Sequence, residues 1–424
     1  MPAFLKFWKI KDLRNGILMV LGILVLFRLV AHIPVPGVDA SALSQFFSGS
    51  QVLGLLNLFS GGTLENFSVI ALGVGPYITS SIIFQLLAMI IPSLEEMQKE
   101  ERGRQKINHY TRLATVPLSL LQGYGIITLL SSQAAQGGIS LTLAGWNMAI
   151  ALIAMTAGTI FLMWLGELIS ERNIGNGISI LIFAGIIAGL PTTLQRTVAT
   201  FDQSQIFDAA LFVILMIVSV AAVVYINESQ RNIPVQYARM RQGTRSLGGV
   251  NSSLPLKINI GGMIPIIFAI SIILFPTTLA QFFINAKTVW LANLANVVVT
   301  LFQDQLIYGL SFFILVFAFT FFYAAVVFHP DRIAENLQKQ GGFVPGIRPG
   351  KSTAEYLQWV LNRLLFLGAS FLSIVAVLPI VVSQFTGSQA LVIGGASTII
   401  VVSVVIDVVK QIEAKMAMHE YERA

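Results

Sequence analysis

Ten apolar stretches of about twenty residues run through the chain, and the segments between them hold nearly all of its charge. A helix needs roughly 20 mostly apolar residues to cross the hydrocarbon core of a bilayer. Lipid offers no hydrogen-bonding partner to an unpaired backbone, so a crossing segment of this kind must be helical. The pattern predicts an all-α integral membrane protein with ten transmembrane helices, at about 16–35, 73–93, 113–132, 147–168, 178–195, 207–226, 260–283, 305–328, 359–382 and 389–409.

The composition fits a chain surrounded mostly by lipid, and it excludes several kinds of site. Only 11% of the 424 residues are charged, whereas a soluble domain carries about 25%. The chain has no cysteine, which excludes disulfides and cysteine-based metal sites. Its four histidines are scattered, and none has a partner at ligand spacing. We therefore expect no cofactor and no metal.

The basic residues orient the ten spans. All but three of the 26 Lys and Arg residues fall in the two terminal segments or in alternate loops, if ten spans are assumed. Cytoplasmic loops of membrane proteins collect Lys and Arg. This distribution predicts a multi-pass protein with both termini in the cytoplasm and with two large cytoplasmic loops, at about 228–258 and 329–356. The loops have the charge of a docking surface, although the topology rule alone would also place charge there.

The sequence shows no catalytic constellation, so we expect no enzyme. The string PGIRPGKST at 345–353 resembles a phosphate-binding loop, but Pro345 stands where its first glycine belongs and we expect no strand before it. Ion-coupled transporters usually hold acidic groups at mid-depth or broken helices that coordinate an ion. The spans carry mostly neutral polar groups. This favours a passive conduit over a secondary transporter of a small solute, and a structural scaffold is a third possibility.

Residues 58–78, LFSGGTLENFSVIALGVGPYI, fit neither a span nor an ordinary loop. The part before about Ser68 is too short and polar to cross a bilayer. Backbone of this kind is tolerated at membrane depth only where protein buries it or a watery cavity receives it. Gly61 and Gly62 would make the segment flexible.

Branched aliphatic residues recur where several spans could meet. Val74 and Ile78 lie four apart and share a helix face, as do Ile178 and Ile182. A ring of such side chains could form a hydrophobic constriction that excludes water, but Ile and Val are also simply common in membrane helices. Two halves of five spans, 1–202 and 203–424, would have inverted topologies if they are structural repeats.

Several long motifs of the chain are specific enough to compare with known families. They are NLFSGG (57–62), ALGVGPYITSSIIFQLL (71–87), WLGELISERNIGNGISILIFAGI (164–186), IPVQYARMRQG (233–243), LPLKINIGGMIPIIFAISIILFP (254–276) and GGFVPGIRPG (341–350). Together they resemble the SecY family, the channel subunits of the bacterial protein-translocation complex, and the resemblance covers essentially the whole chain. It implies two inverted five-helix halves around a central pore, with a short re-entrant plug helix at about 57–68. It also implies a channel that passes unfolded preproteins across the cytoplasmic (inner) membrane and releases transmembrane segments into lipid.

The resemblance also assigns roles to residues of this chain. The implied pore ring is Val74, Ile78, Ile178, Ile182, Ile267 and Ile400. The implied plug includes Asn57, Leu58, Phe59, Ser60, Gly61 and Gly62. The lateral gate lies between spans 2 and 3 and spans 7 and 8, where Gln85, Gln122 and Asn259 would hydrogen-bond across it; ordinary contacts between neighbouring helices are the alternative.

The implied partners dock on the cytoplasmic loops. They are the motor SecA and the ribosome with its RNA, together with SecE-like and SecG-like small membrane subunits, secretory preproteins with their signal sequences, and membrane lipid. The implied docking residues are Arg239, Arg241, Arg245, Arg348 and Lys351.

The chain departs from the family pattern at a few positions. Thr244 stands where many members have a second arginine beside Arg245, and Asn173 stands where glycine is usual. Gly75 replaces a larger apolar residue, and Val74 is shorter than the usual isoleucine. We therefore expect a slightly looser ring that depends more on the plug.

Overall fold

The structure is a computed structural model with side chains. It describes residues 10–36, 60, 62–64, 66–136, 145–199, 206–237, 241–242, 245–246, 251–284, 288–386 and 390–423.

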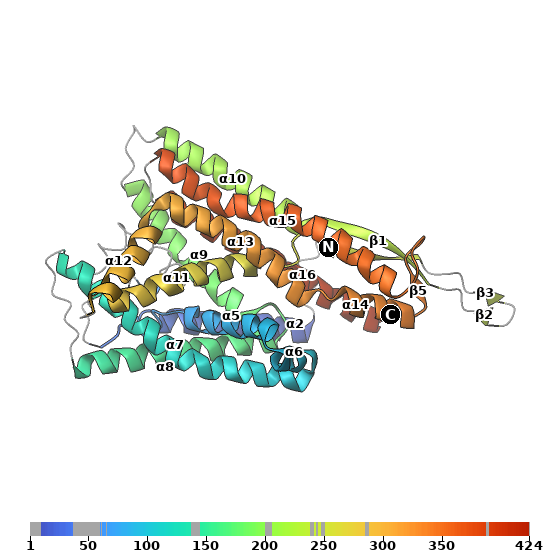
Figure 1. The fold of residues 1–424 in the computed structure, drawn as a ribbon, viewed down its shortest axis with the longest axis horizontal. Helices are drawn as coiled ribbons and strands as arrows, with labels where there is room; N and C mark the ends of the chain where they lie inside the picture. The colour runs from blue at the N-terminus through green and yellow to red at the C-terminus, as the bar shows by residue number, and fades with distance from the viewer. Residues whose placement is uncertain are drawn as a thin grey trace.

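Long helices stand at all ten predicted spans (Figure 1). Within the described residues, five helices are long and apolar enough to cross a membrane by themselves. Helix α5 reaches that length only if it is counted together with the short helix α6 (Pro92–Lys99) that follows it. The ten are α2 (Lys11–Val30), α5 (Gly75–Ile90), α7 (Glu101–Gln136), α8 (Trp146–Glu171), α9 (Gly177–Ala199), α10 (Ile206–Glu228), α11 (Ile264–Phe283), α13 (Gln305–Val327), α15 (Lys351–Thr386) and α16 (Ala390–Arg423).

Several helices extend well beyond the apolar stretch that predicted them. Helix α7 begins at Glu101 rather than near 113, and α16 continues to Arg423. Hydropathy marks where lipid begins, whereas the hydrogen bonds of a helix continue wherever the backbone can make them. The charged ends of these helices therefore lie outside the apolar layer.

Three further helices were not predicted. They are α6 (Pro92–Lys99), α12 (Val289–Gln303) and α14 (Pro330–Lys339). Helix α6 is bent by 112° from α5. The break falls at Ile91, because the proline that follows disfavours helical backbone in the residue before it.

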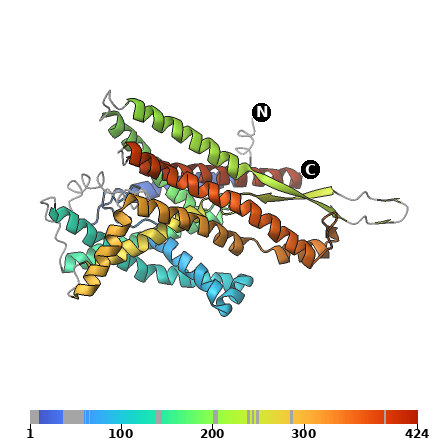
Figure 2. The same ribbon diagram turned by 45° about the horizontal axis from the view of Figure 1, so that its top comes forward.

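The loops at 228–258 and 329–356 contain a small sheet that the all-α expectation did not include. Strand β1 (Gln230–Tyr237) lies between β4 (Asn251–Lys257) and β5 (Gly342–Phe343), and both pairings are antiparallel. Strands β2 (Arg241–Gln242) and β3 (Arg245–Ser246) pair beyond its end (Figure 2). We call the opposite end of the helix bundle, where α12 lies, the distal end (Figure 1).

The helices of the two predicted halves meet along two contacts. Helix α11 packs on α5 and α7, and α16 packs on α9. Most of the core is one hydrophobic cluster with members from both halves. The boundary between the halves near 202 stays a prediction, since 200–205 lie outside the described residues.

Candidate functional site

The six residues of the predicted ring gather in the main hydrophobic cluster. Five of them are buried members of it, and Ile178 is partly buried and packs against them. They come from the first turns of α5, from α9, α11 and α16, and thus from both halves. Packing brings together side chains that lie up to 326 positions apart in the chain, which spacing along single helices could not show. The other ring members are Val74, Ile78, Ile182, Ile267 and Ile400.

A cavity of about 270 Å³ adjoins this cluster. Ile78, Ile178 and Ile267 form part of its wall, and the rest includes polar side chains, among them Ser81 and Gln85. It is lined by residues of α5, α8, α9, α11 and α13, so both halves contribute to it. A partly polar cavity therefore lies beside the apolar cluster that holds the predicted ring residues.

An ion pair at the edge of this cavity was not predicted. Glu167 of α8 lines the cavity, and its Oε1 lies 2.6 Å from Nε of Arg112 of α7. Both side chains are partly exposed, so the pair adds little stability. Arg112 directly precedes the predicted span at 113–132, and Glu167 lies at the end of the next one, at 147–168. These positions at the ends of consecutive spans were the only signal in the sequence that the two residues could pair.

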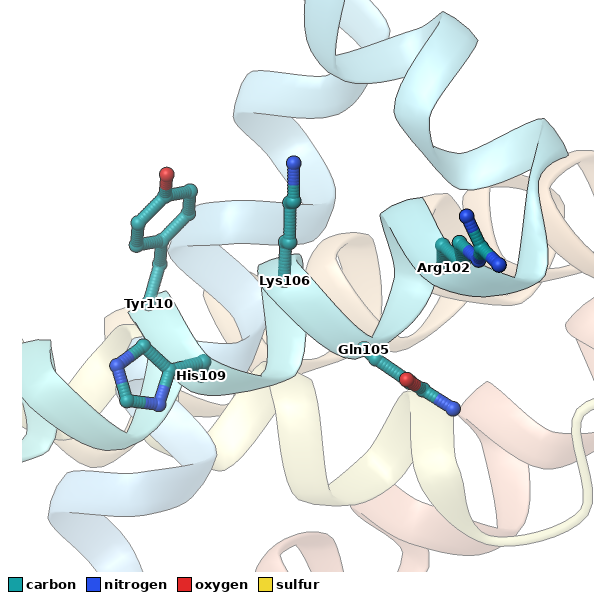
Figure 3. A pocket seen from close by; sticks show the side chains of 5 residues that line it. All are labelled: Arg102, Gln105, Lys106, His109 and Tyr110. Atoms are coloured by element: carbon teal, nitrogen blue, oxygen red, sulfur yellow. The ribbon is translucent and has the colours of Figure 1, made fainter.

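A second hollow, of about 490 Å³, is lined by one helix only. Figure 3 shows its lining side chains, which leave α7 in several directions. No second element faces them among the lining residues, so the hollow is an open basic surface rather than an enclosed site. The lining residues are Arg102, Gln105, Lys106, His109 and Tyr110.

The second part of the predicted plug segment, which includes Thr63 and Phe67, is held firmly where the structure describes it. Thr63 Oγ1 donates to the carbonyls of Ser60 (2.7 Å) and Ile70 (2.9 Å). Val35 N donates to Phe67 O at 2.9 Å. Beside this bond, an isolated antiparallel bridge pairs Ser68 with Pro34 in the loop after α2. Phe67 is 1% exposed and packs in a second cluster with residues of α7 and α8. This anchor leads directly into α5 and the ring.

The plug itself is only partly described. Asn57, Leu58, Phe59 and Gly61 lie outside the described residues. Ser60 and Gly62 are described, as turn and bend, and the described residues up to Ser68 contain turns and a bridge. Gly62 has φ +76°, a conformation that glycine adopts without strain. The plug role stays a prediction.

The predicted gate residues hydrogen-bond within their own halves. Gln122 Nε2 of α7 donates to Thr79 Oγ1 of α5 at 3.3 Å. Gln85 Nε2 donates to Ser81 Oγ at 3.0 Å, one turn away on α5. Both amides lie on the helices that face α11, but these bonds do not cross to it. Thr79 is one of the neutral polar groups of the predicted spans, and its bond with Gln122 was not predicted.

Asn259 lies in a buried polar network of the second half. Its Nδ2 donates to Asn227 Oδ1 (2.6 Å) and to Gly262 O (3.0 Å). Asn227 Nδ2 in turn donates to Ser403 Oγ at 3.1 Å. The network ties the start of α11 to α10 and α16, since these three residues lie at or beside those helices. The spacing of residues along the sequence did not predict this network.

The predicted docking residues lie around the sheet. Arg348 is exposed in the turn after β5, where its carbonyl accepts from Thr353 Oγ1 at 2.8 Å, and Lys351 begins α15. Arg241 and Arg245 lie in β2 and β3, and Arg239 lies outside the described residues. One small cluster, which includes Ile233, Leu256 and Val344, joins both loops to α15.

The structure also bears on two details of the sequence interpretation. The expectation that no strand precedes Pro345 was wrong, because β5 ends two residues before it; the missing glycine still argues against a phosphate-binding loop. Asn173 has φ +52°, in the left-handed region that glycine and asparagine tolerate best. That explains why asparagine can stand there in place of glycine.

The chain is similar to known protein-translocation channels. The SecY family model matches residues 68–409. The protein translocase subunit SecY of Streptomyces coelicolor is 43% identical over 444 residues, with 100% of this chain and 99% of the relative covered.

Two solved structures share the fold. One is described by the words that the plug domain of the SecY protein stabilises the closed state of the translocation channel and maintains a membrane seal; its TM-score is 0.62 at 19% identity, over 94% of this chain and 91% of that one. The other is Sec61 in the canine ribosome–channel complex from the endoplasmic reticulum, with a TM-score of 0.56 at 18% identity and the same coverage. The family match along most of the sequence and the relative at 43% identity establish that the chain belongs to the SecY family of protein translocase subunits.

Proposed function

We propose that the chain is a protein-conducting channel that passes unfolded preproteins across the bacterial cytoplasmic membrane and releases transmembrane segments sideways into lipid. The observation that supports this function is the apolar cluster that both halves form, with a partly polar cavity beside it; we infer that this cluster is the constriction of the channel. A small-solute transporter is not supported by the relatives, which are protein translocase subunits.

The constriction acts by excluding water. Ions lose hydration free energy between branched aliphatic side chains, so a narrow apolar passage resists ion flow. A polypeptide can part the same side chains, because they have no directional bonds to break. The channel role requires no bond to be made or broken in the substrate, so the chain is a conduit and not an enzyme.

Lateral release needs the contact of α5 and α7 with α11 to open. The amide groups of Gln85 and Gln122 donate to residues of their own half, so separation from α11 leaves the Gln122–Thr79 bond intact. A hydrophobic signal sequence that binds between α5, α7 and α11 would shift the closed–open equilibrium in proportion to its preference for the open form.

The partners follow from the surfaces. The sheet and the turn at Arg348 present exposed basic groups at one end of the bundle, suited to SecA or to the ribosome and its RNA. A related channel is described in complex with a ribosome. SecE-like and SecG-like subunits would cover part of the exposed apolar surface of the bundle. The sheet end faces the cytoplasm, in agreement with the distribution of Lys and Arg.

Cysteine crosslinking tests the path, because the chain has no cysteine of its own. Ile78→Cys, Ile182→Cys and Ile267→Cys should each form a disulfide with a single cysteine in a stalled secretory chain. Ile153→Cys on α8 is the control, since Ile153 is 64% exposed on the outside of the bundle. Crosslinks at Ile153 that equal those at the three ring positions would overturn the proposed path.

A further inference from the structure

Helix α12 is an uncharged helix that does not cross the membrane. Its 15 residues, VWLANLANVVVTLFQ, include no Asp, Glu, Lys or Arg. A helix of this length is about 22 Å long, shorter than the roughly 30 Å of a bilayer's hydrocarbon core. An apolar helix that is too short to span is either part of a protein core or lies at a membrane interface.

The packing of its neighbours places both ends of α12 at the distal end. Phe268, near the start of α11, contacts Phe319 and Tyr323, near the end of α13, with ring centroids 5.8 and 6.2 Å apart. The two helices are therefore antiparallel, and α12 connects the end of one to the start of the other. Figures 1 and 2 both show α12 running across the ends of the long helices rather than alongside them.

One face of α12 packs on the protein. Ala295 is 1% exposed, and Phe302 packs against the main hydrophobic cluster. The helix contacts both α11 and α13. Its position is therefore fixed to α11, the helix that meets the first half.

The other face is an apolar stripe that the described residues of the chain leave exposed. Trp290, Leu294, Val297 and Leu301 are spaced by four, three and four residues, so they lie on one side of the helix. Each is between 43% and 65% exposed. A helix in a protein core would not expose such a stripe. Helix α12 therefore fits the other alternative for a short apolar helix, a position at a membrane interface.

Two observations indicate lipid as the occupant of this stripe. The next helix, α13, begins two residues after the end of α12 and is a membrane span that exposes Leu306, Leu310 and Ile314. Trp290 stands at the start of α12, and tryptophan is enriched where membrane meets water. The surface next to α12 is thus already a lipid-facing one.

We propose that α12 is an interfacial helix whose stripe, Trp290, Leu294, Val297 and Leu301, is immersed in the lipid leaflet at the distal end, which is the outer leaflet in the proposed orientation. The helix lies along the membrane surface and anchors the α11–α13 connection there. Lipid of that leaflet then contacts an element that packs directly on α11.

Depth measurements by electron paramagnetic resonance test this proposal. The full chain, purified in its membrane complex, carries a nitroxide on Leu294→Cys or Val297→Cys and is reconstituted into vesicles of phosphatidylethanolamine and phosphatidylglycerol. Asn293→Cys and Asn296→Cys are matched controls on the exposed polar side of the same helix, and Leu310→Cys on α13 reports the value for acyl chains. Collisions with oxygen, which concentrates in lipid, are compared with collisions with a water-soluble nickel chelate.

The proposal predicts that Leu294 and Val297 have an oxygen-to-nickel ratio several-fold above that of Asn293 and Asn296 and closer to that of Leu310. Equal ratios at all four positions of α12 would place the stripe in water and overturn the proposal. Low collision rates with both reagents at Leu294 and Val297 would show that another protein, a small subunit or a second copy of the chain, covers the stripe, which also overturns it.

Discussion

At the scale of single residues, the structure replaces a predicted gate contact with a structural network. Asn259 was expected to bond across the contact between the halves, but its amide donates to Asn227 and to Gly262. Buried amides in this position hold helices α10, α11 and α16 together. Opening of α11 from the first half should therefore leave the second half intact, because these bonds join residues of the second half only.

Substitution of Asn227 tests the value of that network. Asn227→Ala removes the oxygen that accepts from Asn259 and the amide that donates to Ser403. Both bonds are buried, so the variant should lower the free energy of unfolding by about 1–3 kcal/mol. Asn362→Ala is the matched control, because Asn362 accepts from Gln358 on the exposed surface of α15. Thermal unfolding of the purified channel in detergent measures both. Equal melting temperatures for the two variants would show that the network contributes little.

The ring residues were predicted partly from helical spacing and partly from the family resemblance. Spacing along single helices paired Val74 with Ile78 and Ile178 with Ile182. Ile267 and Ile400 were candidates beside a second isoleucine each, and the family resemblance singled them out. The structure places all six in contact with one cluster. The looser ring expected from Val74 and Gly75 stays a prediction.

At the scale of elements, hydropathy located the ten long helices and missed the shorter helices and the strands. Helices α6 and α14 are polar, and the strands of the sheet stand in charged loops. β1 does alternate, with Ile233 and Val235 buried and their neighbours exposed. The signal for a strand was present there, but eight residues in a basic loop were read as docking surface only.

The turn at Arg348 is the element that we expect to contact a motor. Arg348→Glu should impair SecA-dependent transport several-fold while the channel complex still assembles, because the side chain is exposed and only its carbonyl is held within the chain. Import of a preprotein into vesicles measures the effect.

Lys339→Glu on α14 provides the control for the Arg348 variant. Lys339 Nζ lies 2.7 Å from Glu335 Oε1, and this hydrogen bond and the charge of Lys339 lower the pKa of the Glu335 carboxyl. An exposed pair of this kind contributes little to stability. The same charge change is thus made near the turn but outside it. If Lys339→Glu impairs transport as strongly as Arg348→Glu, general charge rather than the turn is responsible.

At the scale of the whole molecule, the function depends on the contact between the halves. Gly125 of α7 allows a close approach to α11: a Cβ at that position would lie 2.9 Å from the carbonyl oxygen of Thr278. Such a distance is shorter than ordinary contacts, and the neighbour is backbone that cannot turn away. The closed state therefore depends on the absence of a side chain at this position.

Gly125→Ala should bias the channel toward the open state. The added methyl group disfavours the closed contact and has no such penalty once α7 and α11 separate, so a preprotein with a defective signal sequence should be exported more efficiently. Gly22→Ala in α2 is the control, since a Cβ there meets no atom within 4 Å. Export of the defective preprotein in cells measures both variants. No gain over Gly22→Ala would contradict the close-approach argument.

The sequence alone determined that the chain is a ten-helix membrane protein, because lipid requires long apolar helices, and the charge of its loops predicted how the spans are oriented. Its motifs identified the family. Only the tertiary structure decided which polar groups pair, that the basic loops form a sheet, and that α12 lies across the distal end with an apolar face exposed. Hydropathy records how a residue interacts with lipid or water, but not which neighbour the folded chain places beside it.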